Sequence, residues 1–341
     1  MSETNTAVQG SGRRGLGRRR KGGGEQSMVP EAEFTSYYGR PVVKPSPWEA
    51  DIPAYMFFGG LAAGSSMLAA GGDLTERPTL RRVGRLASLV SLTATLVTLI
   101  HDLGRPSRFL NMLRTMKLTS PMSVGTWILS AYGPFAGLAA VSELVDMLPG
   151  GKKRGVLRLV SALGKPAGVV AAVTAPPVAA YTAVLLSDTA TPSWHEAHRE
   201  LPFVFVGSAA AAAGGLGLMA VPPEEAGPAR RMAVGGAVLE MAAEQQMERS
   251  MGITAEPLHE GTAGRLMRAS KALTAAGAVG ALLSRRSRLA GVVSGAALIT
   301  GSVCTRFGIF HAGQESAKDP RYTVVPQRER LDRGQPIRYE G

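Results

Sequence analysis

The chain has 341 residues, of which 45% are hydrophobic and only 19% are charged, and its formal net charge is +12. The apolar residues lie in blocks of about 15–23 between short charged loops, a pattern typical of a polytopic helical membrane protein, since about 20 apolar residues span the hydrocarbon core. The single cysteine, Cys304, excludes an intrachain disulfide and an iron–sulfur cluster held by this chain alone. We interpret the excess of Lys and Arg as loop residues that set topology and touch anionic lipid, and we expect no nucleic-acid partner.

Residues 1–50 form a polar, basic tail in which Arg13-Arg14 and Arg18-Arg19-Arg20-Lys21 stand among glycines. This composition predicts a disordered segment. A twin-arginine export signal is rejected, because Gly22-Gly23-Gly24-Glu25 follows the arginines where an apolar stretch is required.

Eight apolar segments follow, and we predict that each forms a membrane-spanning helix. They cover about residues 52–71, 83–101, 123–145, 166–186, 202–221, 232–247, 269–284 and 289–310. The sixth carries Glu240 and Glu244 and the seventh is short, so these two match a span least well. The fold class predicted is therefore all-α, a polytopic integral membrane protein with about eight transmembrane helices.

Eight spans place both ends of the chain on one side of the membrane, which we call side A; the opposite side is side B. The short side-B loops (73–85, 149–165, 222–231 and 284–288) are richer in Lys and Arg than the side-A loops (102–122, 187–200 and 248–271). The positive-inside rule then makes side B cytoplasmic. The basic N-terminal tail favours the opposite orientation, but long tails count less in that rule. All five histidines and the three tryptophans fall on or near side A, which indicates a functional face there.

The stretch His101-Asp102-Leu103-Gly104-Arg105-Pro106 follows the second segment directly. Gly104 allows a tight exit from a helix and Pro106 cannot continue one, so the stretch is interpreted as the polar mouth of a membrane helix. Ionisable groups in a membrane are costly, so each requires a reason. For His101 and Asp102 one interpretation is a helix cap with a loop ion pair to Arg105 or Arg108.

Five stretches, in order, resemble the polysulfide reductase membrane-subunit family, also called the NrfD-like family. They are Gly59-Gly60-Leu61-Ala62-Ala63-Gly64; His101 to Pro106 with Arg108-Phe109; Ser120-Pro121-Met122-Ser123-x-Gly125-x-Trp127; Tyr181-Thr182-x-x-Leu185-Leu186 with Pro192-x-Trp194 and Pro202; and Arg306 with Ala312-Gly313-Gln314. The resemblance runs from about Trp48 to Gln314. Ala183 replaces a glycine usual in the family, and Trp48, Glu49 and Asp51 stand where some members place a histidine.

The resemblance implies two four-helix bundles, here at residues 51–190 and 191–311, with a polar C-terminal tail at 312–341. It implies a quinone- or quinol-binding anchor subunit of a molybdopterin-type oxidoreductase in the cytoplasmic membrane, with menaquinone as the expected quinone and no metal in this chain. The implied partners are a [4Fe–4S] ferredoxin-like subunit and a molybdopterin catalytic subunit. Haem is not expected, because all five histidines lie at helix ends or in loops rather than facing each other within spans.

Quinone chemistry moves two protons with two electrons, so a titratable group must lie within hydrogen-bond reach. We expect His101, Asp102 and Tyr181 to carry that chemistry; an interfacial anchor is the alternative role for the tyrosine. The expected headgroup contacts are His101, Asp102, Arg105, Arg108, Asn111, Trp127 and Tyr181. A break at Pro176-Pro177 is expected to open the packing near Tyr181.

Glu240 and Glu244 are spaced i, i+4 and share a helix face. They are interpreted either as partners of loop arginines or as part of a proton path through the second bundle. The rival function is an ion or solute transporter that uses two bundles for alternating access. The side-A histidines and tryptophans favour a docking face over a site at the membrane midplane.

Overall fold

The computed structural model describes residues 41–103, 105–149 and 154–332, apart from the side chains of Ser107 and Arg108. Every regular element within these ranges is helical, which confirms the all-α prediction. The predicted disordered tail lies outside the described residues as far as residue 40.

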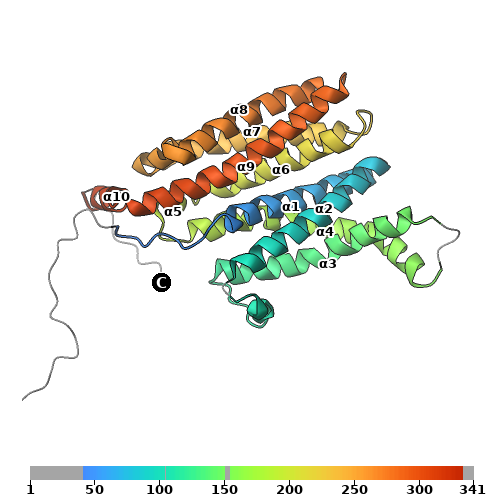
Figure 1. Ribbon diagram of the computed structural model, residues 1–341, viewed down its shortest axis with the longest axis horizontal. Helices are drawn as coiled ribbons and strands as arrows, with labels where there is room; N and C mark the ends of the chain where they lie inside the picture. The colour runs from blue at the N-terminus through green and yellow to red at the C-terminus, as the bar shows by residue number, and fades with distance from the viewer. Residues whose placement is uncertain (1–40, 104, 150–153, 333–341) are drawn as a thin grey trace, which may run out of the picture. The chain divides into compact units, whose positions relative to one another are not determined.

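Two groups of long helices run side by side (Figure 1). The first group is α1 (Asp51–Leu74), α2 (Pro78–Asp102), α3 (Pro121–Met147) and α4 (Val156–Ser187). The second group is α6 (Leu201–Ala220), α7 (Gly227–Ser250), α8 (Gly261–Leu283) and α9 (Arg288–Lys318). Short helices connect or follow them: the 3₁₀ helices η1 (Pro106–Leu113) and η2 (Gly252–Leu258), α5 (Pro192–Glu196) and α10 (Arg321–Asp332).

Six of these helices, namely α1, α2, α3, α4, α6 and α9, are long and apolar enough to cross a membrane. Helices α7 and α8 are also of spanning length, at 24 and 23 residues, but their composition is too polar. These helices contain the sixth and seventh apolar segments, the two whose sequences are least suited to span a membrane. The total of eight spans therefore stays a prediction.

Helix α1 packs on α2 and α4, and α3 packs on α4; in the second group α6 packs on α7 and α9, and α8 on α9. The two groups meet where α1 and α4 pack on α6. A Cβ atom on Gly64 of α1 would lie 2.7 Å from the Cβ of Ala213 in α6, so only a glycine allows this close approach. The glycine-rich motif of α1 thus forms a joint between the groups. The bundle boundaries at 51–190 and 191–311 remain a prediction.

Two sequence predictions about helix limits are wrong. Helix α4 starts at Val156 rather than near Pro166, and it runs without interruption through Pro176-Pro177, so the predicted break is absent. Prolines are tolerated inside membrane helices because neighbouring helices and local adjustments satisfy the freed backbone groups.

At the other end of the chain, α9 continues past His311 to Lys318 and α10 follows, where a polar tail was expected. Its last turns are buried at Ala312, Gly313, Ser316 and Ala317, because they pack against α5 and η2.

Candidate functional site

Two buried tyrosines meet between α1 and α4. The hydroxyl groups of Tyr55 and Tyr181 hydrogen-bond to each other, and their ring centroids lie 6.3 Å apart in an edge-to-face arrangement. Both side chains are buried. Tyr181 was expected in the site, but Tyr55 was not. Its partnership depends on how α1 is rotated toward α4, which no local sequence pattern reveals.

The Tyr181 ring lies against the backbone of α3 at Gly125. A Cβ atom on Gly125 would lie 2.5 Å from Cε2 and 2.7 Å from Cδ2 of that ring. The glycine therefore makes the space that the ring fills.

The polar end of α2 is tied to the start of α1. His101 Nδ1 lies 2.8 Å from Asp51 Oδ2, and the imidazole is largely exposed. This contact gives His101 a partner in Asp51 rather than in Arg105. The side chain of Arg108 lies outside the described residues, so a pair of His101 or Asp102 with Arg108 stays a prediction. Asp102 itself is half-buried.

Asp51 and Tyr55 stand one turn apart on α1, so their side chains lie on the same face of that helix. Their two contacts therefore bring His101 of α2 and Tyr181 of α4 to the same end of the first helix group. The spacing of Asp51 and Tyr55 alone does not reveal this arrangement, which also requires α1 to pack between α2 and α4.

The remaining predicted residues are not shown in contact with the tyrosine pair. Arg105, Asn111 and Trp127 are exposed, and the side chain of Arg108 lies outside the described residues. Trp127 is two positions after Gly125 on α3, which turns it away from the face that contacts Tyr181. Of the predicted residues, His101 and Tyr181 are thus placed at the same end of the first helix group through Asp51 and Tyr55, and Asp102 follows His101 at the end of α2.

Several other family-like residues form a side-A packing joint. Trp194 is buried, stacks at 6.0 Å on Trp48 and donates from Nε1 to the Ile309 carbonyl at 2.9 Å. Gln314 of α9 donates from Nε2 to the carbonyl oxygens of Ser46 and Trp48, both at 3.1 Å. These motif residues fasten the segment before α1 to the end of α9.

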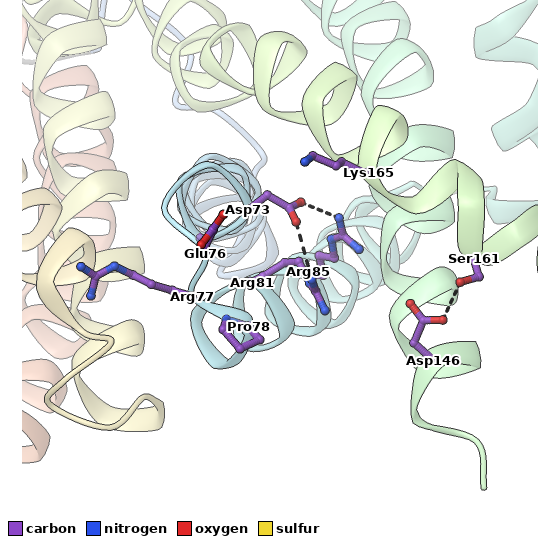
Figure 2. Close-up of a pocket in the computed structure, with 10 residues that line it drawn as sticks. Asp73, Glu76, Arg77, Pro78, Arg81, Arg85, Asp146, Ser161 and Lys165 are labelled. Carbon is purple, nitrogen blue, oxygen red and sulfur yellow. Dashed lines mark hydrogen bonds and ion pairs between the residues drawn. The ribbon is translucent and has the colours of Figure 1, made fainter. Parts of the chain in front are cut away.

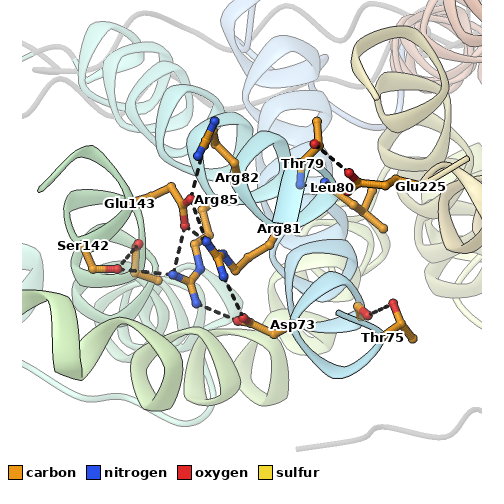
Figure 3. A network of polar contacts seen from close by, with 12 residues as sticks. Asp73, Thr75, Thr79, Leu80, Arg81, Arg82, Arg85, Ser142, Glu143 and Glu225 are labelled. Carbon is orange, nitrogen blue, oxygen red and sulfur yellow. Dashed lines mark hydrogen bonds and ion pairs between the residues drawn. The ribbon is translucent and has the colours of Figure 1, made fainter. Parts of the chain in front are cut away.

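A buried ion network lies at the side-B end of the first group (Figure 3). Glu143 of α3 accepts from Arg81 Nε at 3.0 Å and from Arg85 Nη1 at 3.2 Å, and Arg85 Nη2 reaches Asp73 at 2.6 Å. Glu143 is fully buried, so its charge is compensated by these α2 arginines. The network joins α1, α2 and α3.

A cavity of about 370 Å³ opens beside that network (Figure 2). Its lining mixes both signs of charge, with Asp73 and Glu76 near Arg81 and Lys165. The opposite charges already compensate each other within the wall, so the cavity has no strong preference for a charged ligand.

A second buried polar cluster lies in the other helix group. Glu240 of α7 accepts from Thr305 Oγ1 at 2.6 Å, and the neighbouring Arg306 stacks on the Phe205 ring at 3.7 Å and donates to the Phe205 carbonyl at 2.8 Å. Glu240 and Arg306 are each about 1% exposed. Further toward side A, Glu244 and Glu248 both lie near Lys271, at 3.6 and 2.7 Å.

The expected pairing of Glu240 and Glu244 with loop arginines is therefore wrong: their cationic neighbours come from helices α9 and α8. Within the described ranges, no group of three or more His, Cys, Asp and Glu side chains is placed to hold a metal ion.

The long apolar helices and the ion pairs buried between them define a polytopic helical membrane protein. The protein belongs to the NrfD polysulphide reductase family, whose model, described as "Polysulphide reductase, NrfD", matches residues 42–223.

A curated relative is similar to part of the sequence. The C subunit of the polysulfide reductase of Wolinella succinogenes is 30% identical over 150 residues, which cover 41% of this protein and 47% of the relative. The match thus spans about half of the relative's length. The region matched by the family model includes α1 to α4 and therefore every residue of the tyrosine pair and the α2 end.

Proposed function

We propose that this protein is the quinone-binding membrane anchor of a multi-subunit oxidoreductase, built as two four-helix bundles at residues 51–190 and 191–311. Its family membership supports a role in a redox complex rather than the rival role of a transporter. The observation that carries the proposal is the placement of Tyr181, Tyr55, Asp51 and His101 at one end of the first helix group.

The groups at this end suit a quinone headgroup. A quinone carbonyl accepts hydrogen bonds, and the Tyr55–Tyr181 pair holds one hydroxyl proton more than the pair itself uses, which leaves one donor for such a carbonyl. The adjacent apolar surface includes Trp127 and Met122 of α3, both exposed, so an isoprenoid tail could lie along it. The expected quinone is menaquinone.

The reaction needs protons as well as electrons, and a bound quinone takes up two of each. Tyr181 would orient the headgroup by donating a hydrogen bond from its hydroxyl. His101 would hold a proton on its imidazole, with Asp51 stabilising the charged form at 2.8 Å, and the ring is exposed enough to exchange that proton with water. Asp102 is the second titratable group at this helix end; it would supply the second proton when a quinone is reduced and accept one when a quinol is oxidised.

The electron partner would dock on side A. The relative is by name one subunit of a reductase, which supports partnership with other subunits. We propose a [4Fe–4S] ferredoxin-like subunit as the direct partner and a molybdopterin subunit beyond it. A cluster on that face would lie at the same end of the first helix group as Tyr181 and His101.

Binding of 2,3-dimethyl-1,4-naphthoquinone to the purified full-length protein tests the proposal, with tryptophan fluorescence quenching as the readout. Tyr181→Phe should weaken binding about tenfold, since it removes one hydrogen-bond donor from the headgroup. Tyr132→Phe is the matched control, because its hydroxyl bonds to Ser66, Ser88 and the Ala62 carbonyl elsewhere in the first helix group. Equal affinity in the parent and both variants would move the site out of the first helix group.

Quinol turnover by membranes that contain the assembled complex tests the proton groups. Asp102→Asn should lower the rate and change its pH dependence, whereas Asp188→Asn, an exposed carboxylate at the end of α4, should leave both unchanged. A parent-like pH profile for Asp102→Asn would remove this residue from the proton path.

A further inference from the structure

Four arginines from three parts of the sequence converge on one cavity at the side-B end. The cavity has a volume of about 620 Å³ and lies among Arg77 of the α1–α2 turn, Arg230 and Arg231 at the start of α7, and Arg285 after α8. A volume of this size is typical of ligand-binding cavities. Among the described residues that line the cavity, Glu224 carries the only carboxylate, so the four arginines leave the lining strongly positive.

Two of the arginines are held in place by single hydrogen bonds. Arg77 Nη1 donates to the Glu224 carbonyl at 2.9 Å, and Arg230 Nε donates to Ser284 Oγ at 3.0 Å. The neighbouring Glu225 is paired with neither of them; its carboxylate accepts from the backbone N–H and the hydroxyl of Thr79 at 2.8 and 2.9 Å. The guanidiniums are therefore fixed without an ion pair to any carboxylate within the described ranges.

Two of the cavity arginines also have hydrogen-bond donors that are not used. Arg77 Nε and Arg230 Nη2 are buried and have no hydrogen-bond partner among the described residues. Buried charged donors without an acceptor are costly, and like charges crowded together add to that cost. An anion in the cavity would offset both, and a phosphate group matches the guanidinium fork in geometry as well as in charge.

The cavity also borders an exposed apolar helix surface. Leu282 lines it and is 57% exposed, and Val279, Leu283 and Leu289 nearby are likewise exposed. These side chains belong to α8 and to the first turn of α9. A ligand with a phosphate head and an acyl tail would satisfy both parts of this site, whereas a free phosphate would use only the first.

We infer that Arg77, Arg230, Arg231 and Arg285 form a binding site for the phosphate of an anionic glycerophospholipid, with an acyl tail along Leu282. Basic cavities between membrane helices on the cytoplasmic side are suited to such headgroups, and the positive-inside rule assigns side B to the cytoplasm. The site holds the turn between α1 and α2 to α7 and α8 and so would bridge the two helix groups.

The test is native mass spectrometry of the full-length protein in a neutral detergent, with dioleoylphosphatidylglycerol as the probe. Arg231→Gln/Arg285→Gln should bind this lipid about 30-fold more weakly, on the scale by which cations near the membrane surface attract anionic lipid. Both side chains are exposed, so the substitutions leave the core intact. The matched control is Arg158→Gln/Arg286→Gln, which removes two exposed side-B arginines outside the cavity and should bind like the parent.

Two further probes separate the sources of the phosphate. Inorganic phosphate should protect the parent from thermal unfolding less than phosphatidylglycerol does, and dioleoylphosphatidylcholine should be retained poorly. Stronger protection by inorganic phosphate would overturn the lipid assignment. If the cavity variant and the control variant bind the lipid equally well, or both fail to bind it, the four arginines do not form the proposed site.

Discussion

Gly125 of α3 and Tyr181 of α4 are packed so closely that a methyl group on the glycine would overlap the edge of the tyrosine ring, 2.5 Å from Cε2. The ring position, and with it the hydroxyl that meets Tyr55, is therefore set by the absence of a side chain on the facing helix.

Gly125→Ala should displace the Tyr181 ring and weaken naphthoquinone binding about tenfold, while costing about 1–3 kcal/mol of stability through overpacking. Gly137→Ala is the control on the same helix, because nothing lies within 4 Å of the added Cβ. That variant should bind like the parent and be slightly more stable, since alanine favours a helix over glycine. Quinone titration and thermal unfolding in detergent measure the two effects, and parent-like behaviour of Gly125→Ala would contradict the contact.

The Tyr55–Tyr181 hydroxyl pair should show energetic coupling. Tyr55→Phe or Tyr181→Phe alone leaves a buried hydroxyl without its partner and should cost about 1–2 kcal/mol of unfolding free energy. The double variant removes both hydroxyls, so it should be more stable than the sum of the single effects predicts. Strict additivity in a double-mutant cycle of denaturant unfolding would mean that the hydroxyls do not interact.

Glu143→Gln should be strongly destabilising, by about 3–5 kcal/mol, because it leaves the buried Arg85 with only Asp73 to compensate its charge. Glu76→Gln removes an exposed carboxylate at the same end and should change stability by less than about 0.5 kcal/mol. Thermal unfolding of the two variants in the same micelles makes the comparison. Similar small effects in both would indicate that water reaches Glu143.

Glu240→Gln should destabilise the second helix group by about 3 kcal/mol, since its carboxylate interacts favourably with the charge of the buried Arg306. Arg306 keeps its stacking on Phe205 and its bond to the Phe205 carbonyl, so the protein should still fold. Glu260→Gln, an exposed residue before α8, is the control. Hydrogen exchange of α7 and α9 amides reports the difference, and unchanged protection in Glu240→Gln would show that Arg306 needs no counter-charge.

Much of the fold follows from hydrophobic blocks alone. The apolar segments predicted the long helices, and Glu240 and Glu244 marked the sixth segment as a poor span, in agreement with the polar composition of α7. The break predicted at Pro176-Pro177 is absent. Proline interrupts a helix that is exposed to water, whereas in a membrane protein neighbouring helices can satisfy the backbone groups that the prolines leave unpaired.

The candidate site could be predicted only in part. His101 was proposed from its residue type at a helix end, whereas Tyr181 was proposed from its place in a family-like stretch. Asp51 and Tyr55 became visible only once α1 was placed between α2 and α4, because the contacts depend on helix rotation and not on local sequence.

The hydrogen bonds of Gln314 to the carbonyl oxygens of Ser46 and Trp48 restrict how the two helix groups can move relative to each other. The two helix groups are joined covalently at the α4–α6 connection, and they are joined again where α9 grips the segment that leads into α1. Because the two helix groups are connected at both places, one group cannot rotate freely relative to the other. Such a frame is suited to keeping a redox group at a constant distance from an electron donor, because electron tunnelling tolerates little drift, and it is poorly suited to opening alternately to the two sides of a membrane.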